Sequence, residues 1–427
     1  MSRVLILGLG QYPHGSGVEA AVFFAKRGDE VVVTDLKSAK ELSANVKRLS
    51  KYKNVRFVLG EHCLEDVREA DIVVPNPRVR SDSPFFQEAL RLGKTIESDI
   101  SLFLSACKAS VIGVTGTRGK STTSTLIAEM LKTDGRRVWL GGNILVSPLT
   151  FLSKVRASDW VVLELSSWQL ELTGRKGVSP SYAVWTNLMR DHLNTYAGME
   201  EYGEAKAQIF RHQDQDGIVF LPMDKSFSAY ADSAPGQVIR VGGEQTDSAG
   251  IVNSVHIKIL GEHNKRNAEF AVAVAREVGV SMANIKKTLR TFPGVPHRQE
   301  EIAVIKGVRY INDTTSTTPD ATIAALKTFI GRNSIHLIFG GTDKELEFEE
   351  VAKVMKRTKP LIYLLPGTAR EKIVKALTKA KVVWSDALSL QDAMTHITSH
   401  VVRGDLVLLS PGCTSFGSFK NEFDRGE

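Results

Sequence analysis

SVIGVTGTRGKSTT, residues 110–123, is the stretch that decides the fold of this chain. Its first part, 110–114, is an apolar β-branched run typical of a buried strand, and the segment 124–131 that follows has the periodicity of an amphipathic helix. Between them lies a glycine-bearing turn, which aims free backbone N–H groups at a phosphate while the helix dipole favours the same negative charge. The stretch therefore predicts a nucleotide-phosphate loop at the edge of an α/β sheet.

The side chains of this loop suit ATP. Lys120 can reach the β- and γ-phosphates, and the Ser121 hydroxyl can bind Mg²⁺. The generic motif begins with a glycine five residues before Gly119, but that position is Val114 here. The prediction therefore depends on the strand–loop–helix context and not on the motif alone. The expected phosphate-binding residues are Gly116, Thr117, Gly119, Lys120, Ser121 and Thr122.

On both sides of the loop, β-branched runs alternate with helical segments, which is typical of parallel α/β sheets. The expected strands are 4–7, 30–34, 55–59, 71–74, 110–114, 160–165, 182–187, 309–311, 335–339, 361–365, 382–384 and 405–409. The segment FPGVP, 292–296, interrupts this pattern and indicates a linker that could act as a hinge. We predict three α/β domains: a Rossmann-like domain (1–94), a central P-loop ATPase-like domain with a mostly parallel sheet (95–297), and a Rossmann-like C-terminal domain (298–427).

The composition excludes several classes of protein. No apolar run reaches the roughly 18 residues of a membrane span, and the start, MSRVLILGLG, leads into a glycine turn, unlike a signal peptide. The cysteines Cys63, Cys107 and Cys413 have neither zinc nor disulfide spacing. The net charge of +7 is spread along the chain, which argues against a nucleic-acid partner and fits polyanionic small substrates. We expect a cytoplasmic monomer without a membrane partner.

Two polar residues follow strands that neighbour the loop. Glu164 ends an apolar strand, at a position where a Mg²⁺ ligand is needed, and a metal would offset the cost of burying its carboxylate. The alternative is that Glu164 pairs with an arginine in the core. His192 lies just past the next strand, on the edge where open α/β sheets bind ligands. We expect His192 to contact metal or phosphate, although a lone histidine is more often structural.

Lys206 lies in a predicted helix, 199–210, on the same side as Tyr202, Ile209 and Phe210. A partly buried lysine has a depressed pKa and is a better nucleophile at neutral pH. Reaction with CO₂ would then turn this cation into a carbamate, a carboxylate able to bind metal. From helical phase alone, an ordinary lysine stem packed on the helix face is the favoured interpretation.

The glycine turn near the start, Gly8-Leu9-Gly10, gives a weaker signal. Its spacing to the next glycines differs from the dinucleotide-binding fingerprint, although Asp35 ends the following strand about where such enzymes place an acid. Because Lys37 suits anionic groups, we favour a nucleotide or diphosphate other than NAD. A purely structural glycine turn is the alternative.

Taken together, these motifs resemble those of the Mur ligases. The ordered strings TGTRGKSTT, GGN (141–143), ELSSWQLE, NLMRDHL, GEAKAQIF, GEHNKRNA, PHR (296–298) and INDTT span almost the whole chain. ELSSWQLE, the short N-terminal glycine turn and LLSPGCTSFGSFKN are most similar to the members that add D-glutamate. The resemblance implies that ATP phosphorylates the alanyl carboxylate of UDP-N-acetylmuramoyl-L-alanine. The amine of D-glutamate then attacks this acyl phosphate, in peptidoglycan precursor synthesis.

The resemblance also implies residue roles. Ser121 and Glu164 would bind one Mg²⁺, His192 and carbamylated Lys206 a second, and Lys120 the β- and γ-phosphates. The residues expected around the adenine and ribose are Asn264, Asn267, Arg298 and Asp313. Those expected to contact the UDP-linked substrate are Gly10, Asp35, Lys37 and Asn143. Those expected to contact the incoming amino acid are Thr317, Lys344, Ser415 and Phe423.

Two positions depart from the family pattern. Thr315 replaces a usual lysine, and Glu422 stands where the family has the phenylalanine found here one place later, at Phe423. The chain therefore has one cation fewer and one acid more than the family pattern, which weakens the case for an acidic amino acid. A sibling ligase that adds another amino acid, such as L-glutamate, is the alternative. A folate-polyglutamylating relative fits less well, since its phosphate loop lies near the N-terminus. From other classes, a catalytically silent ATP-binding regulator would not need the acid–His–Lys set, and a dehydrogenase would need NAD.

Overall fold

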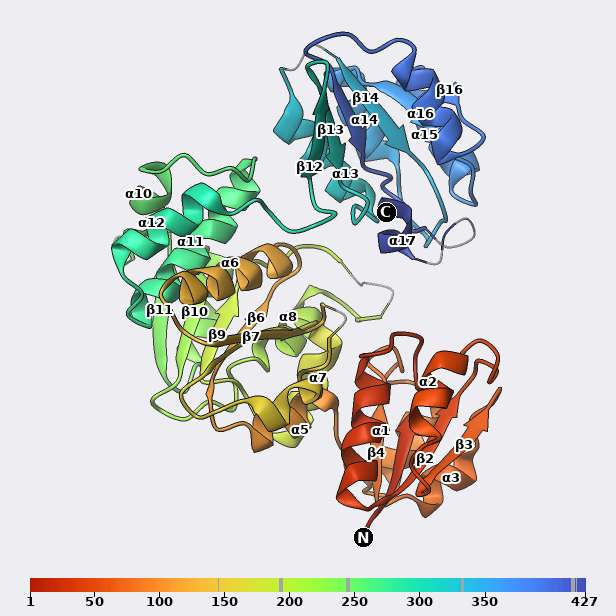
Figure 1. The fold of residues 1–427 in the computed structure, drawn as a ribbon, viewed down its shortest axis with the longest axis vertical. Helices are drawn as coiled ribbons and strands as arrows, with labels where there is room; N and C mark the ends of the chain where they lie inside the picture. The colour runs from red at the N-terminus through yellow and green to blue at the C-terminus, as the bar shows by residue number, and fades with distance from the viewer. Residues whose placement is uncertain (145, 192–194, 243–245, 332–333, 416–418, 420) are drawn as a thin grey trace. The chain divides into compact units, whose positions relative to one another are not determined.

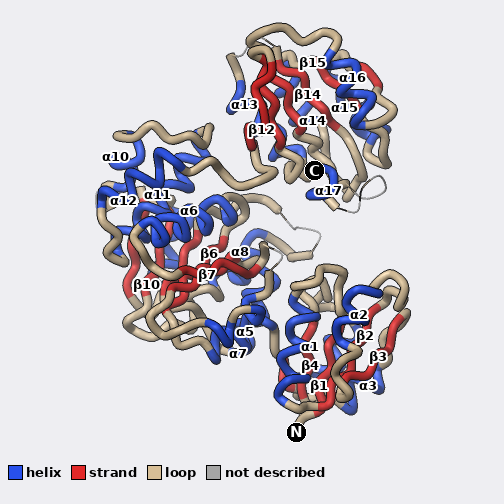
Figure 2. Tube along the Cα trace, viewed as in Figure 1, coloured by secondary structure: helices blue, strands red, loops and turns tan. Residues whose placement is uncertain are grey.

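The computed structural model describes residues 1–144, 146–191, 195–242, 246–331, 334–415, 419 and 421–427. Figures 1 and 2 trace their helices and strands. The described residues form two compact units, Met1–His256 with Lys265–Thr291, and Ile257–Asn264 with Phe292–Glu427. Three β-sheets with flanking helices make up these units, which confirms the predicted α/β class.

The N-terminal sheet is parallel, with strand order β3-β2-β1-β4-β5. Its strands are β1 (Arg3–Leu7), β2 (Glu30–Asp35), β3 (Val55–Leu59), β4 (Ile72–Pro75) and β5 (Thr95–Ile96). The helices are α1 (Ser16–Arg27), α2 (Ser43–Leu49), α3 (Leu64–Glu69) and α4 (Pro84–Arg91). Alternate residues of β1 pack against α1 on one face and against α3 and α4 on the other. The winding direction reverses between β1 and β4, where sheets of this kind bind ligands.

The central sheet has the order β11-β10-β9-β6-β8-β7, and its strands are parallel. They are β6 (Ser110–Thr115), β7 (Val138–Gly142), β8 (Trp160–Glu164), β9 (Tyr182–Trp185), β10 (Ile218–Pro222) and β11 (Gln237–Val241). The α-helices are α5 (Asp99–Ala106), α6 (Lys120–Thr133), α7 (Ser167–Lys176), α8 (Met199–Ala207), α9 (Ser228–Asp232), α10 (Ser248–Asn253), α11 (Glu262–Glu277) and α12 (Met282–Thr291). Because β8 and β9 flank β6, their carboxyl ends lie beside the phosphate loop.

The C-terminal sheet has the order β12-β13-β17-β14-β15-β16 and is parallel apart from the hairpin β12–β13. Its strands are β12 (Glu300–Ile305), β13 (Val308–Asn312), β14 (Ile335–Phe339), β15 (Leu361–Leu364), β16 (Ser385–Asp386) and β17 (Leu406–Leu409). The helices are α13 (Pro319–Phe329), α14 (Glu349–Thr358), α15 (Arg370–Ala380), α16 (Leu390–Thr398) and α17 (Glu422–Gly426). Lys306 and Gly307 close the hairpin with positive φ angles of 51° and 80°, as tight two-residue turns require.

One predicted strand is misplaced. The run 382–384 was expected to be a strand, but the strand that pairs with β15 is the next two residues, Ser385 and Asp386. Val382 and Trp384 pack partly against the core, while Val383 is 85% exposed. The apolar run therefore gives the alternating burial of a strand without its pairing.

The compact units do not separate 1–94 from 95–297, so the three domain ranges remain predictions. The boundary between Thr291 and Phe292 does fall at the start of the proline-bearing segment. Within the described ranges, none of the helices combines the length and apolar character needed to cross a bilayer.

Candidate active site

The phosphate loop joins β6 to α6, and its two glycines have conformations that exclude other residues. Gly116 has φ 151° and Gly119 has φ 82°, both unfavourable for a side chain. A Cβ at Gly116 would lie 2.0 Å from the Thr186 hydroxyl, and one at Gly119 would lie 2.1 Å from Asn267 Oδ1. The loop is therefore closely packed between the end of β9 and α11. Asn267, predicted to contact the adenosine, lies against the predicted phosphate loop.

Two residues that the sequence analysis did not single out, Thr186 and Asn187, fix the loop. The Asn187 side chain accepts a hydrogen bond from Arg118 N and donates one to Arg118 O, both at 2.9 Å. The Thr186 hydroxyl donates to the same carbonyl at 2.8 Å. On the other flank, Thr117 N donates to Asn187 O at 3.1 Å. The only sequence signal for this role is weak: Thr186 and Asn187 are polar residues directly after an apolar strand.

Lys120, the first residue of α6, folds back over the loop. Its Nζ donates to Gly116 O at 3.0 Å and to Thr117 O at 3.1 Å. Ser121 and Thr122 are buried directly after it. The ammonium thus lies on the loop, where the predicted phosphate contact requires a positive charge.

Glu164 ends β8, level with Val114 on β6 and Gly142 on β7. It is buried, and its Oε1 accepts a hydrogen bond from Asn143 Nδ2 at 2.9 Å. Its Oε2 is also buried and has no hydrogen-bond partner among the described residues. A buried carboxylate oxygen without a partner is costly unless a cation binds it, so this position fits a Mg²⁺ ligand. Within the described part of the chain Glu164 forms no ion pair with an arginine, which removes support for the structural alternative.

Gly142 determines how closely β7 approaches Glu164. It has φ 98°, and a Cβ there would lie 2.2 Å from the Glu164 carbonyl oxygen. Gly135 also has a positive φ, 82°, but has no atom within 4 Å of such a Cβ. Both glycines therefore have a positive φ, but only Gly142 lacks the space for a side chain.

We expect Gly142→Ala to destabilise the first unit by about 2–5 kcal/mol, from backbone strain plus the clash. Gly135→Ala should cost only the strain, about 1–2 kcal/mol. Denaturant unfolding, followed through the transition of the unit that contains both glycines, measures the difference. Equal losses for the two variants would show that the close approach to Glu164 is not a constraint.

Lys206, on α8, is 1% exposed, which makes it one of the largest fully buried side chains. Its Nζ donates to Gly116 O at 3.1 Å and lies 4.5 Å from the centre of the Tyr202 ring. Burial, together with the nearby charge of Lys120 and partly opposed by Asp191, lowers the pKa of Lys206 to about 6. The amine is therefore mostly neutral at neutral pH. The phosphate loop and this buried amine share one backbone carbonyl.

The remaining predicted metal ligand, His192, lies outside the described residues. Its neighbour Asp191 faces Arg118 of the loop, with 3.8 Å between Oδ2 and Nη2. In the described ranges, no group of three or more His, Cys, Asp or Glu side chains is arranged to hold a metal. Mg²⁺ commonly takes one or two protein ligands together with substrate phosphates, so Ser121 and Glu164 still fit such an ion.

The predicted contacts to the UDP-linked substrate divide into two places. Asp35, at the end of β2, accepts hydrogen bonds from Gly10 N at 3.0 Å and from Lys37 N at 2.9 Å. These three residues thus meet at the carboxyl edge of the N-terminal sheet, where Gly10 has φ 78°. Asn143 instead contacts Glu164 in the central sheet.

Asp313 is the most constrained of the predicted nucleotide residues in the second unit. Burial raises the pKa of Asp313 to about 6, although hydrogen bonds oppose the shift. The carboxylate accepts from the hydroxyls of Ser316 and Ser410 and from Gln299 N. In the same unit, Arg298 is exposed, and Asn264 donates to Leu260 O at 2.8 Å.

Three loops and helix α17 of the second unit carry the predicted amino-acid contacts. Thr317 is half-buried, Lys344 is exposed, and the buried Ser415 hydroxyl has no hydrogen-bond partner among the described residues. Phe423 meets the His297 ring edge-on, with 5.7 Å between centroids. Backbone hydrogen bonds join the loops: Gly412 N donates to Ser316 O at 2.8 Å, and Thr342 N to Thr414 O at 2.9 Å. The structure therefore brings the loops of Thr317, Lys344 and Ser415 together.

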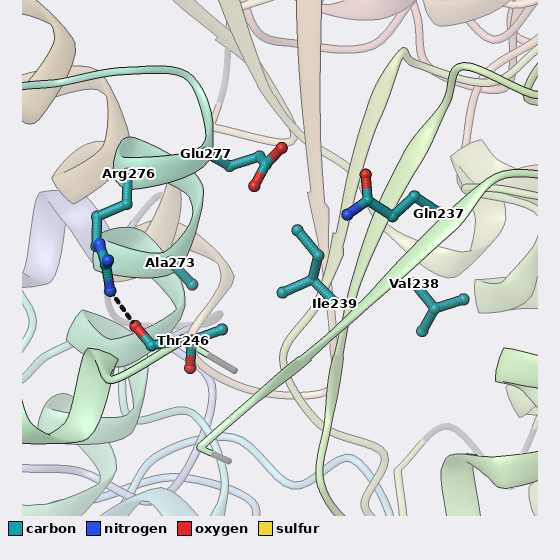
Figure 3. Close-up of a pocket in the computed structure, with 7 residues that line it drawn as sticks. All are labelled: Gln237, Val238, Ile239, Thr246, Ala273, Arg276 and Glu277. Carbon is teal, nitrogen blue, oxygen red and sulfur yellow. Dashed lines mark hydrogen bonds between the residues drawn. The ribbon is translucent and has the colours of Figure 1, made fainter. Parts of the chain in front are cut away.

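A separate hollow of about 330 Å³ lies between β11 and α11 (Figure 3). Its lining residues are Gln237, Val238, Ile239, Thr246, Ala273, Arg276 and Glu277. One of its polar groups, the Arg276 guanidinium, donates to Thr246 O at 2.5 Å. The hollow contains none of the predicted site residues, so it is distinct from the phosphate site.

Comparison with known proteins agrees with this geometry. Residues 114–275 match the Mur ligase middle domain, and residues 297–413 match the Mur ligase glutamate ligase domain. The UDP-N-acetylmuramoylalanine--D-glutamate ligase of Roseiflexus sp. (strain RS-1) is 38% identical and aligns over 100% of this chain and 97% of its own length. That of Borreliella afzelii (strain PKo) is 35% identical over 99% and 95%.

Solved structures share the fold at lower sequence identity. The UDP-N-acetylmuramate-alanine ligase MurC from Thermotoga maritima superposes with a TM-score of 0.61 at 18% identity, over 96% of both chains. FolC of E. coli, in complex with ADP, gives 0.55 at 17% identity, over 74% of this chain and 90% of that one. At these identities the likeness concerns the fold alone.

Proposed function

The chain belongs to the Mur ligase family, and we infer from this that it is an ATP-dependent ligase adding D-glutamate to UDP-N-acetylmuramoyl-L-alanine. Relatives named for this reaction align over its full length at 35–38% identity. The observation that supports the chemistry is the convergence at the carboxyl edge of the central sheet. There a phosphate loop, the unpartnered oxygen of Glu164 and the neutral amine of Lys206 lie on adjacent elements. The product would be a precursor of peptidoglycan.

The reaction proceeds in two steps. An oxygen of the alanyl carboxylate attacks the γ-phosphorus of ATP, the bond to the β,γ-bridging oxygen breaks, and ADP leaves. The amine of D-glutamate then attacks the acyl carbon, the tetrahedral intermediate expels phosphate, and the nitrogen loses a proton. Lys120 and the loop N–H groups would orient the phosphates, so that catalysis is mainly positioning and charge stabilisation. The loop residues proposed for this are Gly116, Thr117, Gly119, Lys120, Ser121 and Thr122.

Ser121 and Glu164 would hold one Mg²⁺, which would neutralise charge on the transferring phosphoryl group. We assign His192 and carbamylated Lys206 to a second. The neutral Nζ of Lys206 would attack the carbon of CO₂: a C–N bond forms, one C=O π bond breaks with its electron pair passing to oxygen, and the nitrogen gives a proton to water, which leaves a carbamate anion. The depressed pKa and full burial of Lys206 support this assignment, because only the neutral amine reacts.

We propose that the three sheets belong to domains spanning 1–94, 95–297 and 298–427. The proposed contacts to the UDP-linked substrate are Gly10, Asp35, Lys37 and Asn143. Those to the adenine and ribose are Asn264, Asn267, Arg298 and Asp313. Those to D-glutamate are Thr317, Lys344, Ser415 and Phe423. We propose that the enzyme acts as a monomer in the cytoplasm, where ATP and UDP-linked substrates are supplied.

A phosphate-release assay with ATP, Mg²⁺ and UDP-N-acetylmuramoyl-L-alanine tests the function. Each candidate amino acid is supplied separately, and Lys120→Ala measures background release. We expect turnover with D-glutamate, and rates near background with L-glutamate, D-aspartate and D-glutamine. A preference for L-glutamate would favour the sibling ligase suggested by Thr315 and Glu422. Background rates with every amino acid would favour a catalytically silent ATP-binding protein.

A further inference from the structure

Arg425, in the C-terminal helix α17, is a buried cation. It is 3% exposed, although arginine is almost never buried unless its charge is paired. Its Nε donates to the Thr314 hydroxyl at 3.0 Å, and Nη2 donates to Thr314 O at 2.8 Å. Both Nη1 and Nη2 donate to Cys413 O at 3.2 Å. The guanidinium fork thus binds two separate loops through three oxygen atoms.

These oxygen atoms are neutral, and the nearby Glu422 only partly offsets the cost of burying the Arg425 charge. Among the described residues, its guanidinium hydrogen-bonds to no carboxylate, and its hydrogen-bond acceptors are the Thr314 hydroxyl and the carbonyls of Thr314 and Cys413. Burial lowers the pKa of Arg425 to about 10, which still leaves the group charged at neutral pH. A buried positive charge held by backbone carbonyls favours an anion nearby, because the protein interior screens it poorly.

The two loops that Arg425 binds are those of the proposed D-glutamate site. Thr314 lies three residues before Thr317, and Cys413 lies two before Ser415. The third loop, which carries Lys344, is bridged to the second through Thr342 and Thr414. Arg425 reaches this loop as well, since its Nη1 would lie 3.6 Å from a Cβ added at Gly341.

The first loop, residues 313–318, has no lysine or arginine of its own. Thr315, at the position where the family usually has a lysine, donates its hydroxyl to His297 O at 2.9 Å. Further contacts hold the end of the chain in place behind these loops: Asn312 Nδ2 donates to Gly426 O at 2.9 Å, and Thr314 donates to Glu422 O at 2.8 Å. The orientation of the guanidinium is therefore fixed from both sides.

We propose that Arg425 is a positioning and specificity-determining residue for the incoming amino acid. It holds the three loops in register and supplies positive charge behind them, which favours a dicarboxylic amino acid. The inference depends on the proposed function, since it assigns Arg425 to the D-glutamate site. Asp313, one residue before Thr314, is held separately by Ser316, Ser410 and Gln299. Loss of Arg425 should therefore affect the amino-acid site more than the proposed nucleotide contact.

The test compares Arg425→Gln and Arg425→Lys with the wild type. Arg425→Gln removes the charge, and we expect the KM for D-glutamate to rise roughly 10- to 100-fold, the effect of losing charge-assisted hydrogen bonds. The KM for ATP should change by less than about 3-fold, because the hydrogen bonds that hold Asp313 do not involve Arg425. Arg425→Lys keeps the charge without the planar fork, and it should recover part of the loss. Acyl phosphate formation in the absence of amino acid can be measured by isotope exchange within ATP. Its rate should be close to that of the wild type in both Arg425 variants.

Arg370→Gln is the matched control. Arg370 lies in the same unit, forms an exposed ion pair with Asp386 at 2.8 Å, and should leave every KM unchanged. The inference is overturned if Arg425→Gln has the wild-type KM for D-glutamate. It is also overturned if the KM for D-glutamate, the KM for ATP and the melting temperature all shift together, which would indicate a merely structural role. If Arg425→Gln fails to fold, Arg425→Lys must still raise the KM for D-glutamate selectively. A wild type inactive with D-glutamate would instead refute the proposed function.

Discussion

Replacing Lys206 by alanine is expected to reduce turnover on the order of 1,000-fold, the scale of losing a major electrostatic group from an active site. The residue is 1% exposed, and its Nζ contacts a carbonyl of the phosphate loop. A lysine carbamate there would provide a metal-binding anion that alanine cannot replace. Acetate or formate, however, is small enough to enter the space that the side chain leaves. We therefore expect millimolar carboxylate to restore part of the activity of Lys206→Ala.

The sign of the pH dependence follows from the pKa of about 6. Above that value the folded enzyme holds a neutral amine, which reacts with CO₂; below it the amine is protonated and unreactive. Carbamate should therefore be lost as the pH falls through about 6. ¹³C NMR of the enzyme equilibrated with ¹³CO₂ measures this directly, and the signal should be missing in Lys206→Ala.

Two further variants separate the carbamate from other roles of Lys206. Lys206→Arg keeps a permanent positive charge, so it should be as inactive as the alanine variant. Lys287→Ala, on the exposed face of α12, should behave as wild type and keep the ¹³C signal. Full activity in Lys206→Ala, or full activity in Lys206→Arg, would refute the carbamate. The carbamate would also be refuted if the wild type gave no ¹³C signal and added carboxylate failed to restore activity to Lys206→Ala.

The burial of Lys206 marks the limit of what sequence reasoning reaches. Helical periodicity places Lys206 on the same side as Tyr202, but it does not say what covers that side. The Lys206 amine contacts the carbonyl of Gly116, which lies 90 residues away in the sequence. Glu164 was easier to predict, because an acid that ends an apolar strand stands out locally. Thr186 and Asn187 gave no comparable signal, since their function is to hold a loop that lies about 70 residues earlier.

The same distinction applies to the fold. The strands around the phosphate loop were predicted because their apolar runs are fully buried on both faces. Three central strands, β7, β10 and β11, were not singled out. β7 and β11 lie at the two edges of the sheet, and β10 ends in Pro222. Edge strands with glycine, glutamine and arginine lack the continuous apolar pattern, so their pairing becomes evident only from the neighbouring strand.

Glu164→Gln should reduce turnover roughly 100- to 1,000-fold, again the scale of one active-site charge. The substitution preserves shape, and the remaining carbonyl oxygen can still accept the hydrogen bond from Asn143. What it removes is the negative charge at Oε2, the buried atom without a described partner. If that charge binds Mg²⁺, the variant should need a higher Mg²⁺ concentration for half-maximal activity. Titration of Mg²⁺ at saturating ATP measures the shift.

Two comparisons determine whether the charge or the shape of Glu164 matters. Glu129→Gln removes a charge from α6 at a half-exposed position paired with Lys132, and it should leave the Mg²⁺ requirement unchanged. Asn143→Ala removes the hydrogen bond to Oε1 but keeps the carboxylate. If Glu164 served mainly to hold Asn143, Asn143→Ala would be the more damaging change, because Glu164→Gln retains that contact. We expect the reverse for the Mg²⁺ requirement, with Asn143→Ala instead raising the KM for the UDP-linked substrate.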